Sequence, residues 1–527
     1  MINYTDFDKT ASYAKLRSLA PRGKNFNFNE NLTAQRVQTC VVPMASGLIY
    51  SWAAKAVDQP VLDALRALAE EQELVAKYQT LVDGGMMNPG EKRLVLHHLL
   101  RGQVGKPVIH DGKNLGEFYK TQVDRFSAFA DRVHRGELRG SGGKQFDTVV
   151  QIGIGGSDLG PRALYLALEN WAEVQGRKRM NAHFISNVDP DDASSVISKL
   201  TLETTLFILV SKSGTTQETL ANELFVQGKL KKAGLDPAKH LVAVTSETSP
   251  LAHNPHYLDS FYIDDFIGGR YSATSAVGGV ILSLAYGKET FQELLRGAHR
   301  ADLSALERDC VKNPALLDAL IGVWERNFLG YPTTAILPYS QALSRFPAHL
   351  QQLDMESNGK RVNRNGEALG YSTGPIVFGE PGTNGQHSFY QLLHQGTDPV
   401  PLQFIGFLES QRRDDVEVDG SSSQTKLRAN LVAQIVAFAK GKSDGDKNKE
   451  FPGARPSSVI VGPALTAETL GTLLAHFENK VMFQGFVWNI NSFDQEGVQL
   501  GKVLTKKVLS GDSGDPALSA YAQLLGI

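Results

Sequence analysis

The sequence predicts an α/β fold with two lobes, each a doubly wound parallel β-sheet with helices on both faces. Short apolar strands alternate with helices from about residue 145 to 263, and the alternation begins again near residue 310. Such alternation is typical of parallel sheets built from right-handed crossover connections. Residues before 110 favour helices, because their apolar positions recur at helical spacing. One of these helices is expected to begin at Asn88, which precedes a proline.

The composition is that of an ordinary folded chain. It has 527 residues, of which 42% are hydrophobic and 21% charged, and its formal net charge is −2. This length is enough for more than one domain with a core of its own. We expect a mainly helical N-terminal segment over 1–110, a first α/β lobe over 111–290, a second lobe over 291–510 and a C-terminal tail over 511–527.

Several classes of protein are disfavoured by the sequence. A net charge near zero does not favour nucleic acid or an anionic membrane surface as partner. Cys40 and Cys310, the two cysteines, are far apart in the sequence and indicate neither a disulfide framework nor a metal site. Apolar stretches such as 277–286 are too short to span a bilayer. The first residues lack the pattern of a signal peptide, so we expect a cytoplasmic protein.

A hydroxyl-rich loop follows the apolar strand expected over 206–210 and precedes a helix. The helix N-terminus offers unpaired N–H groups and a partial positive charge, and Gly214 allows a tight turn. This combination suits a phosphate group, although an ordinary Ser/Thr helix cap is an equally good interpretation of the stretch alone. The candidate phosphate ligands are Ser211, Lys212, Ser213, Thr215 and Thr216.

A glycine-rich loop over 153–161 follows the strand expected over 148–152. It does not fit the dinucleotide fingerprint, because Asp158 occupies the place of the third glycine. Ser157 and Asp158 suit hydrogen bonds to the hydroxyls of a small ligand, and a simple helix cap is the alternative. Because ligands bind beyond the carboxyl ends of parallel strands, this loop and the hydroxyl-rich loop are expected to line one crevice.

Four further residues have side chains suited to acid–base or electrostatic chemistry. Arg270 follows two glycines, so it lies at a turn from which a guanidinium can reach an oxyanion; a surface arginine is the alternative. Glu356 follows a helix expected over 341–355, and His387 lies in a loop rich in turn-forming residues. Neither these two nor Lys502 has a spacing that identifies a catalytic role by itself.

Taken together, these segments resemble the glucose-6-phosphate isomerase (phosphoglucose isomerase) family from about residue 86 to 510. One departure is Gln499, where the family usually has a glutamate, which removes a charge from the segment that carries Lys502. The resemblance rests on six blocks in the same order, at residues 153–161, 211–219, 268–272, 355–360, 382–388 and 493–502.

The resemblance implies two lobes of the sugar isomerase (SIS) type and interconversion of glucose 6-phosphate and fructose 6-phosphate without metal or other cofactor. Glu356 resembles the base that moves a proton between C2 and C1 through a cis-enediol(ate). His387, assisted by Lys502, resembles the group that opens the sugar ring, and Arg270 the cation that stabilises the developing charge. The remaining substrate contacts that the resemblance implies are Gly156, Ser157, Gln495 and the loop Ser211–Thr216.

The family resemblance also implies a homodimer in which the histidine reaches the site from the partner subunit. Two alternatives remain open at this point. One is a related isomerase that also accepts mannose 6-phosphate or acts on amino-sugar phosphates, although no glutaminase module is visible. The other is a regulator that binds sugar phosphates without catalysis, which the joint presence of Glu356, His387, Arg270 and Lys502 disfavours.

Overall fold

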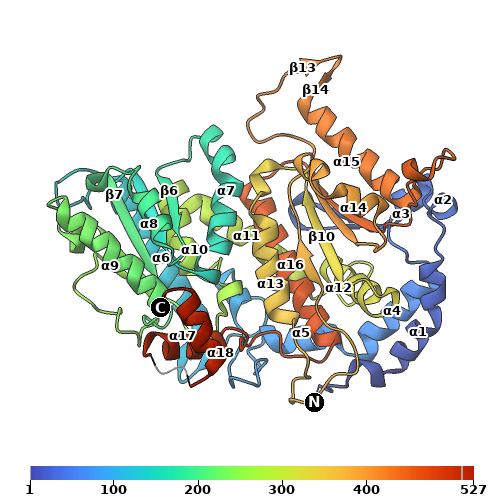
Figure 1. Ribbon diagram of the computed structural model, residues 1–527, viewed down its shortest axis with the longest axis horizontal. Coiled ribbons are helices and arrows are strands. Elements are labelled where there is room, and N and C mark those ends of the chain that lie inside the picture. Colours follow the sequence, from blue (N-terminus) through green and yellow to red (C-terminus); the bar gives the residue numbers. More distant parts are fainter. Residues whose placement is uncertain (1, 512–513) are drawn as a thin grey trace.

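The computed structural model describes residues 2–511 and 514–527, which form two α/β lobes lying side by side (Figure 1). The sheet of the first lobe has five parallel strands in the order β6–β5–β7–β8–β9, with Val150 of β5 opposite His183 of β6 and Phe207 of β7. The expected parallel sheet is thereby confirmed. Its strands are β5 (Thr148–Ile152), β6 (Asn181–Ile185), β7 (Thr205–Val210), β8 (Leu241–Thr245) and β9 (Ser260–Tyr262).

Helices cover both faces of this sheet. All six residues of β7 are buried, with Leu206 facing one layer of helices and Phe207 the other. This is why the strand is apolar at all positions after Thr205 rather than alternating. Helices α8 (Pro190–Ile197) and α9 (Gln217–Lys232) pack on one face; on the other lie α6 (Leu115–His134), α7 (Leu159–Val174) and α10 (Ala276–Tyr286).

The second sheet has six strands in the order β1–β2–β15–β12–β10–β11. Four of them are parallel, namely β10 (Thr333–Pro338), β11 (Ile376–Phe378), β12 (Leu402–Phe407) and β15 (Ser457–Gly462). The other two, β1 (Val41–Pro43) and β2 (Ile49–Ser51), come from the N-terminal segment and add to β15 as an antiparallel hairpin. This hairpin was not predicted from the sequence.

Helices also cover both faces of the second sheet. One face carries α14 (Tyr390–Gln395) and α15 (Ser423–Lys440); the other carries α12 (Pro314–Trp324), α13 (Phe346–Asn358) and α16 (Ala467–Val487). Twenty of the 21 residues of α16 are buried, and this helix packs along α11 (Lys288–Ser304) between the lobes (Figure 1). The N-terminal helices are α1 (Ala11–Lys24), α2 (Phe28–Asn31), α3 (Ala34–Thr39), α4 (Gln59–Glu71) and α5 (Leu74–Val82).

Two helix boundaries differ from the sequence predictions. No long helix begins at Asn88; its backbone pairs with Arg93, its side chain bonds to Glu91, and only the 3₁₀ turn His97–Leu100 follows. The helix expected over 341–355 begins at Phe346, where Pro347 suits the first turn. It continues to Asn358, so Glu356 lies on the last turn of α13 rather than beyond it.

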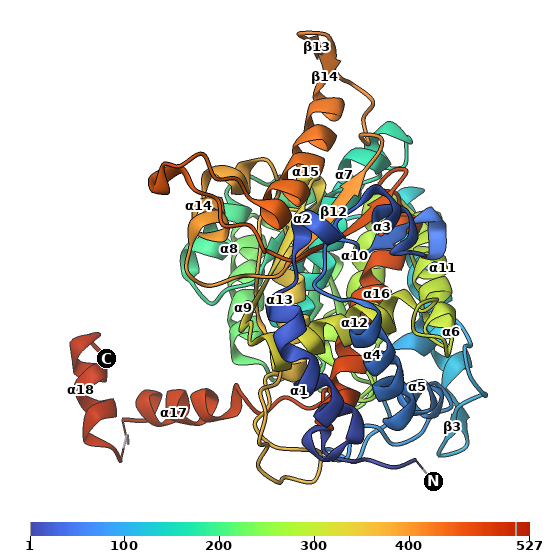
Figure 2. The ribbon, with the colours of Figure 1, turned by 90° about the vertical axis from the view of Figure 1, so that its right-hand side faces the viewer.

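The C-terminal helices α17 (Gln499–Leu509) and α18 (Pro516–Leu524) project away from both lobes (Figure 2). Neither contains a buried residue. Two small hairpins, β3–β4 (Ile109–His110 and Lys113–Asn114) and β13–β14 (Glu417–Val418 and Ser421–Ser422), lie outside the main sheets. Among the described residues, no helix has the length and apolar character needed to cross a membrane.

Candidate active site

The hydroxyl-rich loop lies between β7 and α9, as predicted. Gly214 has a φ of +68°, and a Cβ there would lie 2.2 Å from Ser249 Oγ, so only glycine fits. The Gly214 N–H donates to Ser211 Oγ at 3.1 Å, and the Thr215 hydroxyl donates to Ser213 Oγ at 3.0 Å. Thr216 is the N-cap of α9 but its side chain makes no capping bond, which leaves the first-turn N–H groups available to an anion.

Lys212, in the same loop, is tied to the opposite wall of a pocket. Its Nζ lies 3.5 Å from Asp265 Oδ1 and donates to the Ile267 carbonyl at 3.3 Å. Asp265 also pairs with Arg93, at 3.2 Å. The Asp265 carboxylate thus pairs with both Lys212 and Arg93. A dianion that enters the pocket would meet a lysine whose side chain Asp265 already orients.

The glycine-rich loop lies directly against the turn that carries Arg270. A Cβ added to Gly156 would lie 2.3 Å from the backbone C and O of Gly269, so the two backbones meet without an intervening side chain. Ser157 ends the 3₁₀ turn that contains Gly156. Arg270 lies in the 3₁₀ turn that packs against it, Gly269–Tyr271. The structure therefore brings Gly156 and Ser157 beside Arg270.

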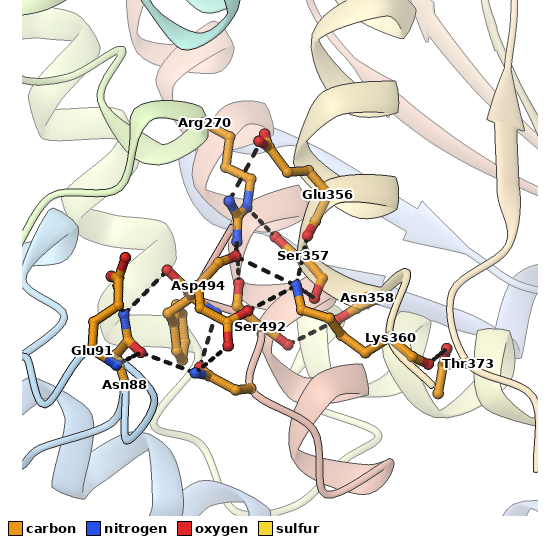
Figure 3. A network of polar contacts seen from close by, with 12 residues as sticks. Asn88, Glu91, Arg270, Glu356, Ser357, Asn358, Lys360, Thr373, Ser492 and Asp494 are labelled. Carbon is orange, nitrogen blue, oxygen red and sulfur yellow. Dashed lines mark hydrogen bonds and ion pairs between the residues drawn. The ribbon is translucent and has the colours of Figure 1, made fainter. Parts of the chain in front are cut away.

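Arg270 is buried, with only 2% of its surface exposed, and every part of its guanidinium is engaged (Figure 3). Its Nε donates to Ser357 Oγ at 2.6 Å, and one terminal nitrogen donates to the carbonyls of Ser492 at 2.6 Å and Asp494 at 3.1 Å. The other terminal nitrogen lies 3.8 Å from Glu356 Oε2. The alternative of a surface arginine is thus wrong, and the cation is fixed next to a carboxylate.

Glu356 lies on the last turn of α13 with 19% of its side chain exposed. Its Oε2 is buried and has no hydrogen-bond partner in the described chain. Buried carboxylate oxygens normally accept hydrogen bonds, so an unpartnered one beside a pocket is an unusual feature that calls for an explanation. A carboxylate held by a cation at 3.8 Å, rather than by a direct hydrogen bond, retains lone pairs that can accept a proton.

A pocket lies beside the Arg270–Glu356 pair, although Glu356 is not among the residues that line it. Lys212, Arg270 and Gln495 all line it, together with residues of the segment 88–95. Gln495 follows Asp494, whose carbonyl accepts from Arg270. The structure thus brings together Gly156, Ser157, Lys212, Arg270, Glu356 and Gln495, from both lobes.

Two predicted residues lie elsewhere in this single chain. His387 ends the 3₁₀ turn Asn384–His387 and is exposed to solvent. Lys502 lies on α17, exposed like its neighbour Gln499, and α17 projects away from the lobes (Figure 2). Neither side chain lines the pocket that contains Arg270. Within the described residues, no group of three or more His, Cys, Asp or Glu side chains is arranged to hold a metal ion.

Several residues of the site were not singled out from the sequence. Ser357 and Lys360 occupy the same short block as Glu356, and Asp494 precedes Gln495. Their contacts join segments far apart in the sequence: Ser357 and Arg270 are 87 residues apart, Lys360 and Asp494 are 134 apart, and Arg270 and Asp494 are 224 apart. Only their presence within the family blocks could have indicated them.

The arrangement defines a class: an α/β protein of two lobes with parallel strands, with a pocket lined by Lys212 and a fixed guanidinium, beside a carboxylate oxygen that has no hydrogen-bond partner in the described chain. Comparison with known proteins narrows this class. The sequence model described as phosphoglucose isomerase matches residues 51–522. The glucose-6-phosphate isomerase of Treponema denticola is 58% identical, covering 99% of this chain and 100% of its own. That of Treponema pallidum (strain Nichols) is 59% identical over 100% of this chain and 99% of its own.

A solved structure is similar along the whole chain. The crystal structure of a glucose-6-phosphate isomerase from Chlamydia trachomatis has 43% sequence identity and a TM-score of 0.92, and it covers 99% of both chains. The chain therefore belongs to the phosphoglucose isomerase family and is an isomerase, which confirms the resemblance found in its sequence.

Proposed function

We propose that this chain interconverts glucose 6-phosphate and fructose 6-phosphate, with Glu356 as the base. The observation that supports this most is the Glu356 carboxylate, whose Oε2 is unpartnered and lies 3.8 Å from the buried Arg270 guanidinium. Relatives that are 58% and 59% identical over nearly the whole chain are glucose-6-phosphate isomerases. The reaction for which these relatives are named thus agrees with the carboxylate and the guanidinium found here.

The phosphate group would bind the loop of Ser211, Lys212, Ser213, Thr215 and Thr216, at the N-terminus of α9. In the open-chain sugar Glu356 would remove the proton from C2 and return it to C1, while the hydroxyl proton moves between O1 and O2. The negative charge that develops on the enediolate oxygens would be stabilised by Arg270, whose position is already fixed before substrate arrives. Ser157 and Gln495 would orient the sugar hydroxyls.

Ring opening requires a proton to move from the anomeric hydroxyl to the ring oxygen. We assign this step to His387 with Lys502, and we propose that His387 is supplied by the partner subunit of a homodimer. His387 is exposed in the single chain, and the projecting α17 and α18 carry apolar side chains that no other described residue of this chain buries. Leu500, Leu509, Tyr521, Leu524 and Leu525 are each more than two thirds exposed.

The test measures turnover of fructose 6-phosphate with a chelator present, with glucose 6-phosphate detected through a coupled dehydrogenase. We expect the wild type to be active and Glu356→Gln to lose at least about 10³-fold in kcat, since amide nitrogen and oxygen cannot replace the base. Glu30→Gln, at an exposed position on α2, serves as the control and should keep full activity. An active Glu356→Gln variant would assign the base to another residue. Binding without turnover by the wild type would instead support a sugar-phosphate-binding regulator.

A further inference from the structure

The C-terminal end of α13 is closed by a side chain that the proposed mechanism does not use. The last four carbonyls of a helix have no N–H donor within the helix. In α13 the Met355 carbonyl accepts from the Gly359 N–H, and that of Asn358 accepts from the N–H groups of Lys360 and Gly374. The remaining two, of Glu356 and Ser357, accept from Lys360 Nζ at 2.8 and 3.1 Å. Lys360 thus folds back to cap the turn that presents Glu356.

The same ammonium group holds the segment that fixes Arg270 (Figure 3). Lys360 Nζ lies 3.1 Å from Asp494 Oδ1 and donates to the Asp494 carbonyl at 3.4 Å. That carbonyl is also an acceptor for Arg270, at 3.1 Å. The other carboxylate oxygen of Asp494 accepts from Asn491 at 2.8 Å, so Asp494 has a fixed orientation. The Lys360–Asp494 ion pair therefore contacts both sides of the site. Lys360 bonds to the Glu356 carbonyl and to the Asp494 carbonyl, and the latter also accepts from Arg270.

This ion pair is shielded from solvent, with side chains that are 18% and 21% exposed. Burial and the nearby Arg270 lower the pKa of Lys360, while Asp494 opposes that effect. Two cations side by side repel each other. Asp494 contacts both residues, because its carboxylate pairs with Lys360 and its backbone carbonyl accepts from Arg270. Without the carboxylate, the ammonium group would lose the anion that holds it in this arrangement.

We propose that Lys360 and Asp494 are positioning residues, which set the distance between the Glu356 carboxylate and the Arg270 guanidinium. This inference rests on the proposed function, because it concerns the base and the cation assigned there. The pair joins the end of α13 to the segment 491–495, which continues into α17 and Lys502. It also ties the base to the start of the C-terminal helices.

The test compares Lys360→Met and Asp494→Asn, singly and combined, with the wild type. We expect each single variant to lower kcat by about 10- to 100-fold, because small displacements of catalytic groups are costly. KM for fructose 6-phosphate should change little, and so should the affinity for glucitol 6-phosphate, which is unreactive, since the phosphate loop is untouched. The kinetic isotope effect with C2-deuterated glucose 6-phosphate should rise, as proton transfer becomes slower. The double variant should be no slower than the slower single variant.

The control is Lys178→Met, which removes a comparable lysine–carboxylate pair at 3.0 Å, with Glu169, outside the pocket. It should keep the wild-type kcat and isotope effect. Thermal unfolding of each variant shows that the assays are made on folded protein. Folded Lys360→Met and Asp494→Asn with wild-type kcat and isotope effect, or with kcat losses that simply add in the double variant, would overturn the inference. Absence of turnover by the wild type would instead contradict the proposed function itself.

Discussion

Gly156 shows how a single residue without a side chain can determine where a catalytic group lies. Its backbone touches Gly269, and an added Cβ would lie 2.3 Å from the Gly269 carbonyl group. Backbone atoms cannot rotate away as a flexible side chain can, so the turn that carries Arg270 would have to move. The two loops belong to different connections of the first sheet, and their contact sets the position of Arg270 against Glu356.

Gly156→Ala is therefore expected to lower kcat/KM by about 100-fold, because Arg270 is displaced from the base. The measurement is steady-state turnover of fructose 6-phosphate together with a thermal unfolding curve. Gly142→Ala is a matched control, since a Cβ there meets no atom within 4 Å, and it should behave as wild type. A fully active Gly156→Ala would show that the two loops can separate without cost to the site.

At the scale of the element, α13 carries two acidic side chains within one turn, and their surroundings differ. Glu356 pairs with Arg270, whereas Asp354 is buried in a cavity that Asp318 and Lys480 also line. Burial raises the pKa of Asp354 to about 6, with Lys480 opposing the shift. Because this pKa is above that of an unfolded aspartate, the contribution of Asp354 to stability is complete below about pH 4 and is lost as the pH rises through about 6.

Asp354→Asn should remove this pH dependence. Relative to the variant, the wild type should lose about 3 kcal/mol of unfolding free energy between pH 4 and pH 7.5, at ~1.4 kcal/mol for each pKa unit. Urea unfolding at several pH values measures the difference. Asp111→Asn, at a side chain that is 91% exposed, should leave the pH profile unchanged. Parallel profiles for wild type and Asp354→Asn would mean that Asp354 is ionised in the folded protein at little cost.

Elements whose signal is local were predictable from the sequence. The strand before Ser211 is apolar from Leu206 to Val210, and its burial on both faces was correctly inferred. The hairpin β1–β2 was missed because its strands are only three residues long and are stabilised by β15, more than 400 residues away. The helix expected at Asn88 was wrong. The Asn88 side chain accepts from the Glu91 N–H as a helix cap would, but Lys92 has a φ of +54° and the Asn88 backbone pairs with that of Arg93, so the chain turns back.

The site residues show the same difference between local signals and contacts that join distant segments. Ser211 and Gly214 belong to one continuous loop with a physical reason for each residue type, so the loop could be inferred before the fold was known. The Arg270–Glu356 pair joins positions 86 residues apart, and no spacing rule indicates that contact. Both residues were candidates from their side chains, but only the family resemblance assigned them roles in one site.

At the scale of the whole molecule, the proposed homodimer rests on the C-terminal helices and on His387. Apolar residues of α17 and α18 are exposed, and α17 carries Lys502 away from the pocket that contains Arg270 (Figure 2). A second copy related by a two-fold axis would cover such surfaces reciprocally, since each subunit presents the same arm and the same histidine. The active site would then contain residues of both subunits.

Mixed dimers test this arrangement. Subunits carrying Glu356→Gln and subunits carrying His387→Ala, each inactive as a homodimer, are co-expressed with different affinity tags and purified as the pair. If His387 serves the partner's site, one site of the pair has both substitutions and the other has none, so the mixed dimer should show about half of the wild-type activity. Pairing a wild-type subunit with one that carries both substitutions should give the opposite result, an inactive dimer, because each of its sites lacks one group. If each site used only its own chain, the first mixed dimer would be inactive and the second half active.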